Sequence, residues 1–142
     1  PGWFPLRYRV LGKTGEPRDL GSTAFDLAAT AKGSLQYAVA GRPYIWDMAA
    51  GLVIVEEAGG VAMVPASLDH RHAKSPDETT WHPLESFSAG EGGGTIEDLR
   101  KWRSTVILGN PLIVHYITRN LRRRRVPWRE RLRYTARWLM RG

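Results

Sequence analysis

The sequence predicts an α/β fold in which helices pack against a sheet. Residues 48–58 are apolar on nearly every side, as in a helix buried between two layers. Gly59-Gly60 would end this helix, and the apolar stretch 61–64 follows directly as a strand. This succession of buried helix, glycine turn and apolar strand is typical of layered α/β sandwiches. Since 42% of the 142 residues are hydrophobic and 25% are charged, we expect most of the chain to fold.

The first half of the chain predicts alternating elements. Residues 1–17 are expected to be extended, because apolar and basic side chains alternate over 6–11 and turn-forming residues follow. A helix should follow Ser22-Thr23, whose hydroxyls can cap its first N–H groups, and should end at Gly33. Residues 35–40 predict a short strand. The helix over 48–58 should begin at Trp46-Asp47, with the aspartate as the cap and the tryptophan in the core.

The second half is less regular. Residues 66–103 are polar and rich in proline and glycine, so we expect mainly a long loop with a short helix over 95–102. A buried strand over 104–108 and a helix over 111–123 should follow, then a final helix over 128–140. The predicted organisation is an extended segment (1–17), a subdomain (18–118) and a helical tail (119–142).

Charge is distributed unevenly between the tail and the rest of the chain. Residues 119–142 hold ten arginines and one glutamate, which gives +9, whereas residues 1–118 hold 11 basic and 13 acidic groups, which gives −2. The net charge of +7 therefore comes from the tail, and a uniformly basic nucleic-acid-binding fold is excluded. The absence of cysteine excludes disulfide scaffolds, thiolate zinc sites and thiol nucleophiles.

Four stretches carry a recognisable pattern. Residues 46–51 read Trp-Asp-Met-Ala-Ala-Gly, and residues 54–60 read Ile-Val-Glu-Glu-Ala-Gly-Gly. Together they resemble the second signature of the inositol monophosphatase family. Upstream, Leu-Gly-Ser-Thr-Ala at 20–24 is similar to that family's Gly-[Ser/Thr]-Ala turn beside the substrate. Residues 106–111, Val-Ile-Leu-Gly-Asn-Pro, resemble its closing strand and turn.

The resemblance implies the C-terminal half of an inositol-monophosphatase-like layered α/β sandwich. It also implies a magnesium-dependent phosphatase acting on a small phosphate monoester of the inositol or sugar phosphate class. Asp47 would be a metal ligand, Gly21, Ser22 and Thr23 would line the substrate, and Arg18 would lie on the phosphate or sugar side. Mg²⁺ prefers hard oxygen ligands, and a pair of such ions can activate water and stabilise the leaving alkoxide.

The sequence also departs from the family pattern. The family's other metal ligands, a glutamate and an Asp-Pro-[Ile/Leu]-Asp-Gly-Thr segment, are missing, and Ala40 stands where a substrate-binding glutamate is frequent. One carboxylate is too few for a metal pair, so we expect this chain alone to be inactive. Its expected partner is another protein chain or a missing N-terminal half. The alternative is a non-catalytic binding or assembly subunit derived from the phosphatase fold.

The arginine-rich tail predicts a second contact surface. On a helix from Trp128, apolar side chains gather on one side and arginines flank them, as in helices that lie on anionic membranes. We expect the tail to contact an anionic membrane surface or a protein, while nucleic acid is the weaker alternative. No signal peptide and no apolar run of about 18 residues is visible, so a cytoplasmic, peripheral location is expected. The expected contact residues are Arg122, Arg123, Arg124, Arg125, Trp128, Arg129, Arg133, Arg137 and Trp138.

Overall fold

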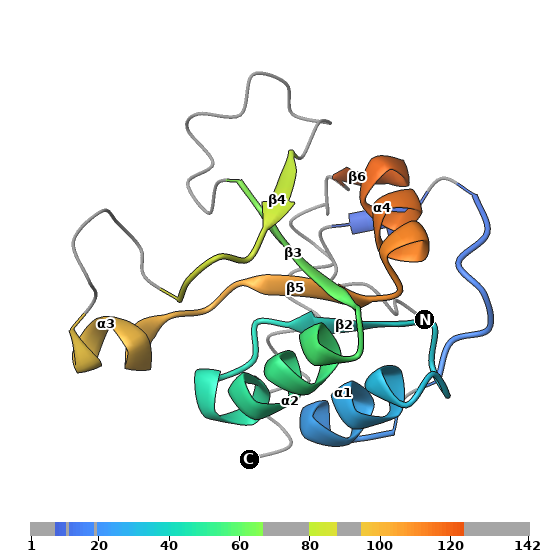
Figure 1. Cartoon of the computed structure of the whole chain (residues 1–142). Helices are drawn as coiled ribbons and strands as arrows, with labels where there is room; N and C mark the ends of the chain where they lie inside the picture. Colours follow the sequence, from blue (N-terminus) through green and yellow to red (C-terminus); the bar gives the residue numbers. More distant parts are fainter. Residues whose placement is uncertain (1–7, 11, 19, 67–79, 88–94, 124–142) are drawn as a thin grey trace, which may run out of the picture.

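A computed structural model describes residues 8–10, 12–18, 20–66, 80–87 and 95–123. Helices and strands are mixed along this part of the chain, which confirms the α/β class (Figure 1). No helix within it is long and apolar enough to span a membrane. The elements are β1 (Tyr8–Val10), α1 (Thr23–Ala31), β2 (Tyr37–Gly41), α2 (Ile45–Glu57), β3 (Val61–Pro65), β4 (Trp81–Pro83), α3 (Ile96–Lys101), β5 (Thr105–Gly109), α4 (Pro111–Asn120) and β6 (Leu121–Arg123).

The main sheet has four strands in the order β2-β5-β3-β4, and every neighbouring pair is antiparallel. All five residues of β5 are buried, as the sequence predicts for 104–108. Successive side chains of a strand point to opposite faces. Val106 and Leu108 accordingly join one core cluster and Ile107 joins the other.

Helices cover both faces of this sheet (Figure 1). On one face, α1 and α2 supply Leu27, Met48 and Leu52 to the core cluster that holds Val106 and Leu108. On the opposite face, α4 supplies Val114 and Ile117 to the cluster around Ile107. The order of layers is therefore α1 and α2, sheet, α4.

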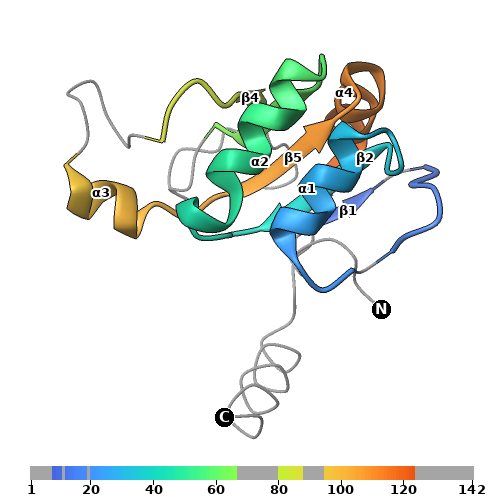
Figure 2. The same cartoon turned by 60° about the horizontal axis from the view of Figure 1, so that its bottom comes forward.

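The two helices α1 and α2 lie side by side and point the same way (Figure 2). The chain returns along β2 between them, so both begin at the same end of the sheet. Their backbones approach closely at Gly51, where an added Cβ would lie 2.6 Å from the Cβ of Leu27. A glycine is therefore required at this crossing.

The second sheet has two strands and joins the two ends of the described chain. β1 pairs antiparallel with β6, with Tyr8 opposite Arg123 and Val10 opposite Leu121. Leu121 is buried in the same cluster as Val114 and Ile117. The prediction of a helix over 111–123 was therefore wrong at its end, because the backbone becomes extended where Leu121 enters the core.

The predicted loop over 66–103 holds one strand that the sequence did not indicate. β4 is three residues long and pairs with the edge of β3, with Trp81 opposite Pro65. So short a strand has no room for an alternating pattern, so its pairing depends on tertiary contacts. The short helix was predicted correctly: α3 begins after Thr95, whose side chain and that of Asp98 form a capping box.

Two predictions about α2 were wrong. It begins at Ile45 after Tyr44, and Asp47 lies inside the first turn instead of capping it. The helix was also expected to be buried between layers, with Trp46 in the core. In the described chain the side of α2 away from the sheet is open, and Trp46 is 61% exposed. The predicted helix over 128–140 and most of the tail lie outside the described residues.

Candidate functional site

The start of α1 is formed by the predicted substrate turn. Gly21 adopts a positive φ of 76°, which a glycine takes up without strain. The chain then turns into the helix, where the Oγ of Ser22 accepts a hydrogen bond from the backbone N–H of Phe25 at 3.4 Å. Thr23 is the first helical residue, so the Gly-Ser-Thr segment is both a helix cap and an exposed turn.

The start of α2 carries the predicted metal ligand. Asp47 lies in the first turn with its side chain exposed. Gly51, one turn further along α2, contacts Leu27 of α1. Figure 2 shows that α1 and α2 are parallel. Thr23 and Asp47 each precede the contact residue of their own helix by four positions, so both should lie about one helical turn before the contact of Gly51 with Leu27. The fold thus brings together two segments that are separated by more than twenty residues.

An arginine and two aromatic rings stand at this same end. The rings of Tyr44 and Trp46 are stacked with their centroids 4.5 Å apart. The guanidinium carbon of Arg103 lies 3.5 Å from the centroid of the Tyr44 ring, which is a cation–π contact. Sequence reasoning missed this cluster, because Arg103 follows α3 and is far from Tyr44 in the chain. No local pattern could have paired them.

The segment that delivers Arg103 is fixed by hydrogen bonds. Thr95 donates to the Asp98 carboxylate from its Oγ1 at 2.8 Å and from its backbone N–H at 3.0 Å. These two bonds lower the pKa of the Asp98 carboxyl, because they favour its charged form. At the other end of α3, Arg103 Nη1 donates to the carbonyl of Arg100 at 3.0 Å. The guanidinium therefore links the end of α3 to the start of α2.

Arg18, which the sequence placed on the phosphate or sugar side, forms an exposed ion pair in the structure. Its Nη2 lies 2.9 Å from Oε1 of Glu16, and both side chains are largely exposed. Exposed pairs of this kind contribute only about 0–1 kcal/mol, so a stronger anion could displace the glutamate. Ala40 is buried in β2, where its methyl group packs in the core beneath α1 and α2.

The donor set for a metal ion is incomplete in the part of the chain that the structure describes. There, no three His, Cys, Asp or Glu side chains gather into a group that could hold a cation. Asp47 offers a hard oxygen ligand of the type that Mg²⁺ prefers, and its exposed position leaves room for others. The described residues thus offer Asp47 as one candidate magnesium ligand, and they do not complete a magnesium site.

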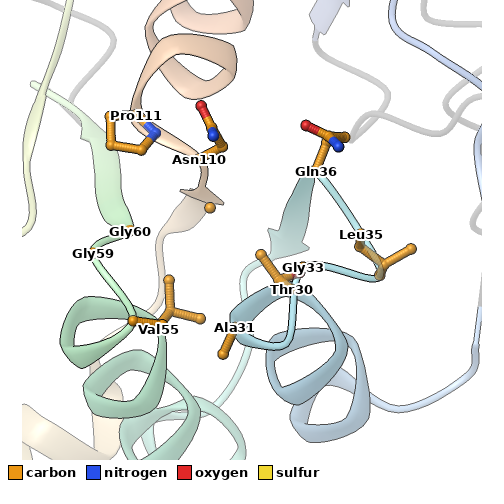
Figure 3. A pocket seen from close by; sticks show the side chains of 12 residues that line it. Thr30, Ala31, Gly33, Leu35, Gln36, Val55, Gly59, Gly60, Asn110 and Pro111 are labelled. Atoms are coloured by element: carbon orange, nitrogen blue, oxygen red, sulfur yellow. The ribbon is translucent and has the colours of Figure 1, made fainter.

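A cavity of about 190 Å³ lies at the opposite end of the helix pair. Figure 3 shows Thr30 and Ala31 from α1, Val55 from α2 and Asn110 before α4 around it. Asn110 caps α4, since its Oδ1 accepts a hydrogen bond from the backbone N–H of Leu112 at 3.0 Å. No charged side chain lines the cavity, and it is distant from Asp47. Its lining is Thr30, Ala31, Gly33, Leu35, Gln36, Val55, Ala58, Gly59, Gly60, Gly109, Asn110 and Pro111.

Comparison with known proteins gives several partial matches. Protein qutG of Emericella nidulans is 38% identical over 73 residues, which are 51% of this chain and 19% of qutG. Quinic acid degradation cluster protein x of Neurospora crassa is 50% identical over 44 residues, covering 31% of this chain and 13% of that protein. Probable inositol 1-monophosphatase ImpA of Mycobacterium tuberculosis is 44% identical over 66 residues, covering 42% and 24%.

The matches cover less than a quarter of each of these relatives, between 13% and 24% of their lengths. No solved structure matches the chain significantly. The model of the inositol monophosphatase family matches residues 6–80, which is more than half of the chain and includes both helix starts described above. The chain belongs to the inositol monophosphatase family.

Proposed function

We propose that this chain is part of a magnesium-dependent phosphatase that hydrolyses a small phosphate monoester of the inositol or sugar phosphate class. The observation that carries the proposal is the close contact of Gly51 with Leu27, from which Asp47 and Thr23 each lie about one turn back at the start of the parallel helices. A metal ligand and a substrate turn must lie side by side to act on the same phosphate ester. The family match over 6–80 spans both.

Each residue has a role that follows from its position. Asp47 offers its carboxylate to a magnesium ion, and magnesium supplies water activation and charge neutralisation in such phosphatases. The first N–H groups of a helix have no intrahelical acceptor, so those following Gly21 and Ser22 can donate to substrate oxygens. Arg18 would leave Glu16 to contact the phosphate or sugar side of the substrate.

The same proposal predicts that the chain alone does not hydrolyse phosphate esters. Asp47 is a single exposed carboxylate, and a catalytic magnesium site needs more ligands than one. The test is release of inorganic phosphate from inositol 1-phosphate in the presence of Mg²⁺, with Mg²⁺ affinity measured by calorimetry. We expect no release above the rate without protein. Turnover by the chain alone that disappears in Asp47→Ala would refute the predicted inactivity and support the assigned ligand.

A non-catalytic binding or assembly subunit is the second candidate. It is favoured by Ala40, whose methyl group is buried in the core and cannot accept a sugar hydroxyl. In this case the arginine-rich tail would dock to a protein complex or to an anionic membrane surface in the cytoplasm. The tail residues beyond Arg123 lie outside the described residues.

The membrane form of this candidate can be tested by co-sedimentation with vesicles that contain an anionic lipid. The truncation should remove 124–142, because Leu121 is buried and a longer deletion would disturb the core. We expect the full chain to sediment with the vesicles at low salt and the truncated chain to stay in solution. Equal sedimentation of the two chains would eliminate the tail as a membrane contact.

A further inference from the structure

The Arg103 guanidinium is held at the start of α2 by contacts that leave one of its edges available. The Tyr44 ring covers one face of the group, and the centroid of the Trp46 ring lies 5.7 Å from the guanidinium carbon. Nη1 donates hydrogen bonds to the backbone carbonyls of Arg100 and Trp102. Because a guanidinium also carries N–H donors on Nε and Nη2, the edge that these two nitrogens form can still bind a ligand.

The positive charge of Arg103 has no counterpart in the part of the chain that the structure describes. There, the side chain forms no ion pair, and neither Nε nor Nη2 donates a hydrogen bond. Arg103 is half-buried, so water solvates its charge less well than that of a fully exposed arginine. By contrast, Arg100 on α3 lies 3.1 Å from the carboxylate of Glu97. Arg103 is therefore a fixed cation whose available edge can donate to an anion.

Arg103 stands on the other side of the predicted metal ligand from the substrate turn. Tyr44, which stacks on Arg103, precedes Asp47 by three residues, which is about 4.5 Å along a helix axis. Figure 1 and Figure 2 both show the start of α2 between the end of α3 and the start of α1. A small substrate at Asp47 therefore has the turn at residues 21–23 on one side and Arg103 on the other.

We propose that Arg103 determines substrate specificity by binding a carboxylate group that the phosphate monoester carries in addition to its phosphate; this inference rests on the proposed function. The edge of a guanidinium donates two parallel hydrogen bonds to the two oxygens of a carboxylate. One positive charge also matches the single negative charge of that group. The substrate is thus the phosphate ester of a small polyol acid or sugar acid, with its phosphate toward Asp47 and its carboxylate toward α3.

Other substrate groups match the available edge less well. A hydroxyl is neutral, so it leaves the charge of Arg103 uncompensated. A second phosphate monoester carries a charge of about −1.5 to −2 at pH 7, which one guanidinium does not neutralise. A carboxylate matches the edge in both geometry and charge.

Three small molecules separate the two ends of such a substrate. The first, 6-phosphogluconate, carries a phosphate and a carboxylate; sorbitol 6-phosphate has a hydroxymethyl group in place of the carboxylate, and gluconate lacks the phosphate. Their affinities for the full 142-residue chain are measured by NMR titration with Mg²⁺. A salt concentration of about 0.15 M screens long-range attraction by the arginine-rich tail. We expect 6-phosphogluconate to bind about fivefold tighter than sorbitol 6-phosphate, the upper end for a partly exposed charge pair.

Variants assign this preference to a residue. Arg103→Gln should give 6-phosphogluconate and sorbitol 6-phosphate equal affinities, because glutamine has neither the charge nor the paired donors. Arg100→Gln is the matched control, since it removes the same charge from α3 and should keep the preference at about fivefold. Circular dichroism verifies that the variants fold. If Arg103→Gln does not fold, Arg103→Lys takes its place and should reduce the preference at least twofold, because lysine keeps the charge without the planar fork.

Two results would overturn the inference. One is that the wild type binds 6-phosphogluconate no tighter than sorbitol 6-phosphate, or binds neither. The other is that Arg100→Gln loses as much of the preference as Arg103→Gln does.

Gluconate tests the proposed function separately. It should bind more weakly than 6-phosphogluconate, because it lacks the phosphate that the metal and the turn at residues 21–23 are proposed to bind. Equal binding of these two compounds, weakened alike by Arg103→Gln, would leave the carboxylate site standing and count against the phosphatase function.

Discussion

The two ends of the α1–α2 layer differ in shape and in chemistry. The starting end carries the exposed Asp47 carboxylate, the Ser22-Thr23 turn and the half-buried Arg103 guanidinium. The finishing end is hollow, with a cavity of about 190 Å³, and is built largely from glycine and small side chains without charge. The cavity therefore offers no charged group from its lining, whereas the Asp47 carboxylate and the Arg103 guanidinium lie at the starting end.

The largest expected effect distinguishes the two ends by activity. In a preparation that supplies the missing carboxylate ligands, Asp47→Ala should reduce phosphate release at least about a thousandfold, because a bound metal contributes several kcal/mol to such reactions. Gln36→Ala, in the cavity lining, should leave the rate within about twofold, because Gln36 lies at the other end of the helix pair from Asp47. Equal losses in both variants would mean that the cavity belongs to the active site.

The second prediction concerns glycines at the two ends. Gly109 has φ of +139°, and an added Cβ would lie 2.7 Å from the carbonyl oxygen of Gln36. Gly109→Ala should therefore lower the free energy of unfolding by about 3 kcal/mol, from strain plus overpacking. Gly21 has φ of +76° but open space around it, so Gly21→Ala should cost only about 1 kcal/mol. Urea denaturation of both variants gives the comparison, and equal costs would contradict it.

The third prediction compares two helix caps. Asn110 accepts hydrogen bonds from the N–H groups of Leu112 and Ile113 at 3.0 and 3.4 Å, whereas the single bond to Ser22 is 3.4 Å long. Replacement of a cap by alanine costs about 0.5–2 kcal/mol. We expect Asn110→Ala near the top of this range and Ser22→Ala near the bottom, measured by thermal unfolding. The reverse order would show that the Ser22 turn is held more firmly than its one bond indicates.

The smallest expected effect concerns pH and the support of Arg103. Hydrogen bonds from Thr95 lower the pKa of Asp98 in the folded protein, so the folded state favours the charged carboxylate. This contribution is complete above the ordinary pKa of an aspartate and is lost as the pH falls through the lowered folded value. In Asp98→Asn, the free energy of unfolding should therefore decrease slightly less steeply as the pH is lowered, as measured by urea denaturation at several pH values. An unchanged acid limb would mean that the capping box does not stabilise the fold.

Local patterns predicted the elements whose residues determine their own structure. The glycine turn after α2, the apolar run of β5 and the capping pair Thr95 and Asp98 all led to correct elements. The Asp47 and Gly21–Thr23 motifs were also found in the sequence, but their placement at one level required the contact between Gly51 and Leu27. A sequence does not show which helices are neighbours.

The failures have a common physical cause in contacts between distant segments. β4 and β6 are short strands that exist because β3 and β1 pair with them. Arg103 meets Tyr44 only after α3 and β5 have been placed. The apolar pattern of α2 predicted coverage on both sides, and the described chain provides coverage on one. Tertiary contacts, which the local apolar pattern does not contain, decide which side of the helix is covered.

The pairing of β1 with β6 sets a condition on synthesis. Val10 pairs with Leu121, so β1 can form its sheet only after the ribosome has made nearly all of the described chain. Closure of so long a loop is entropically costly and comes late in folding. A polypeptide released before Leu121 would lose the β1–β6 pair, together with the packing of Leu121 and Val10 in the core cluster that α4 shares.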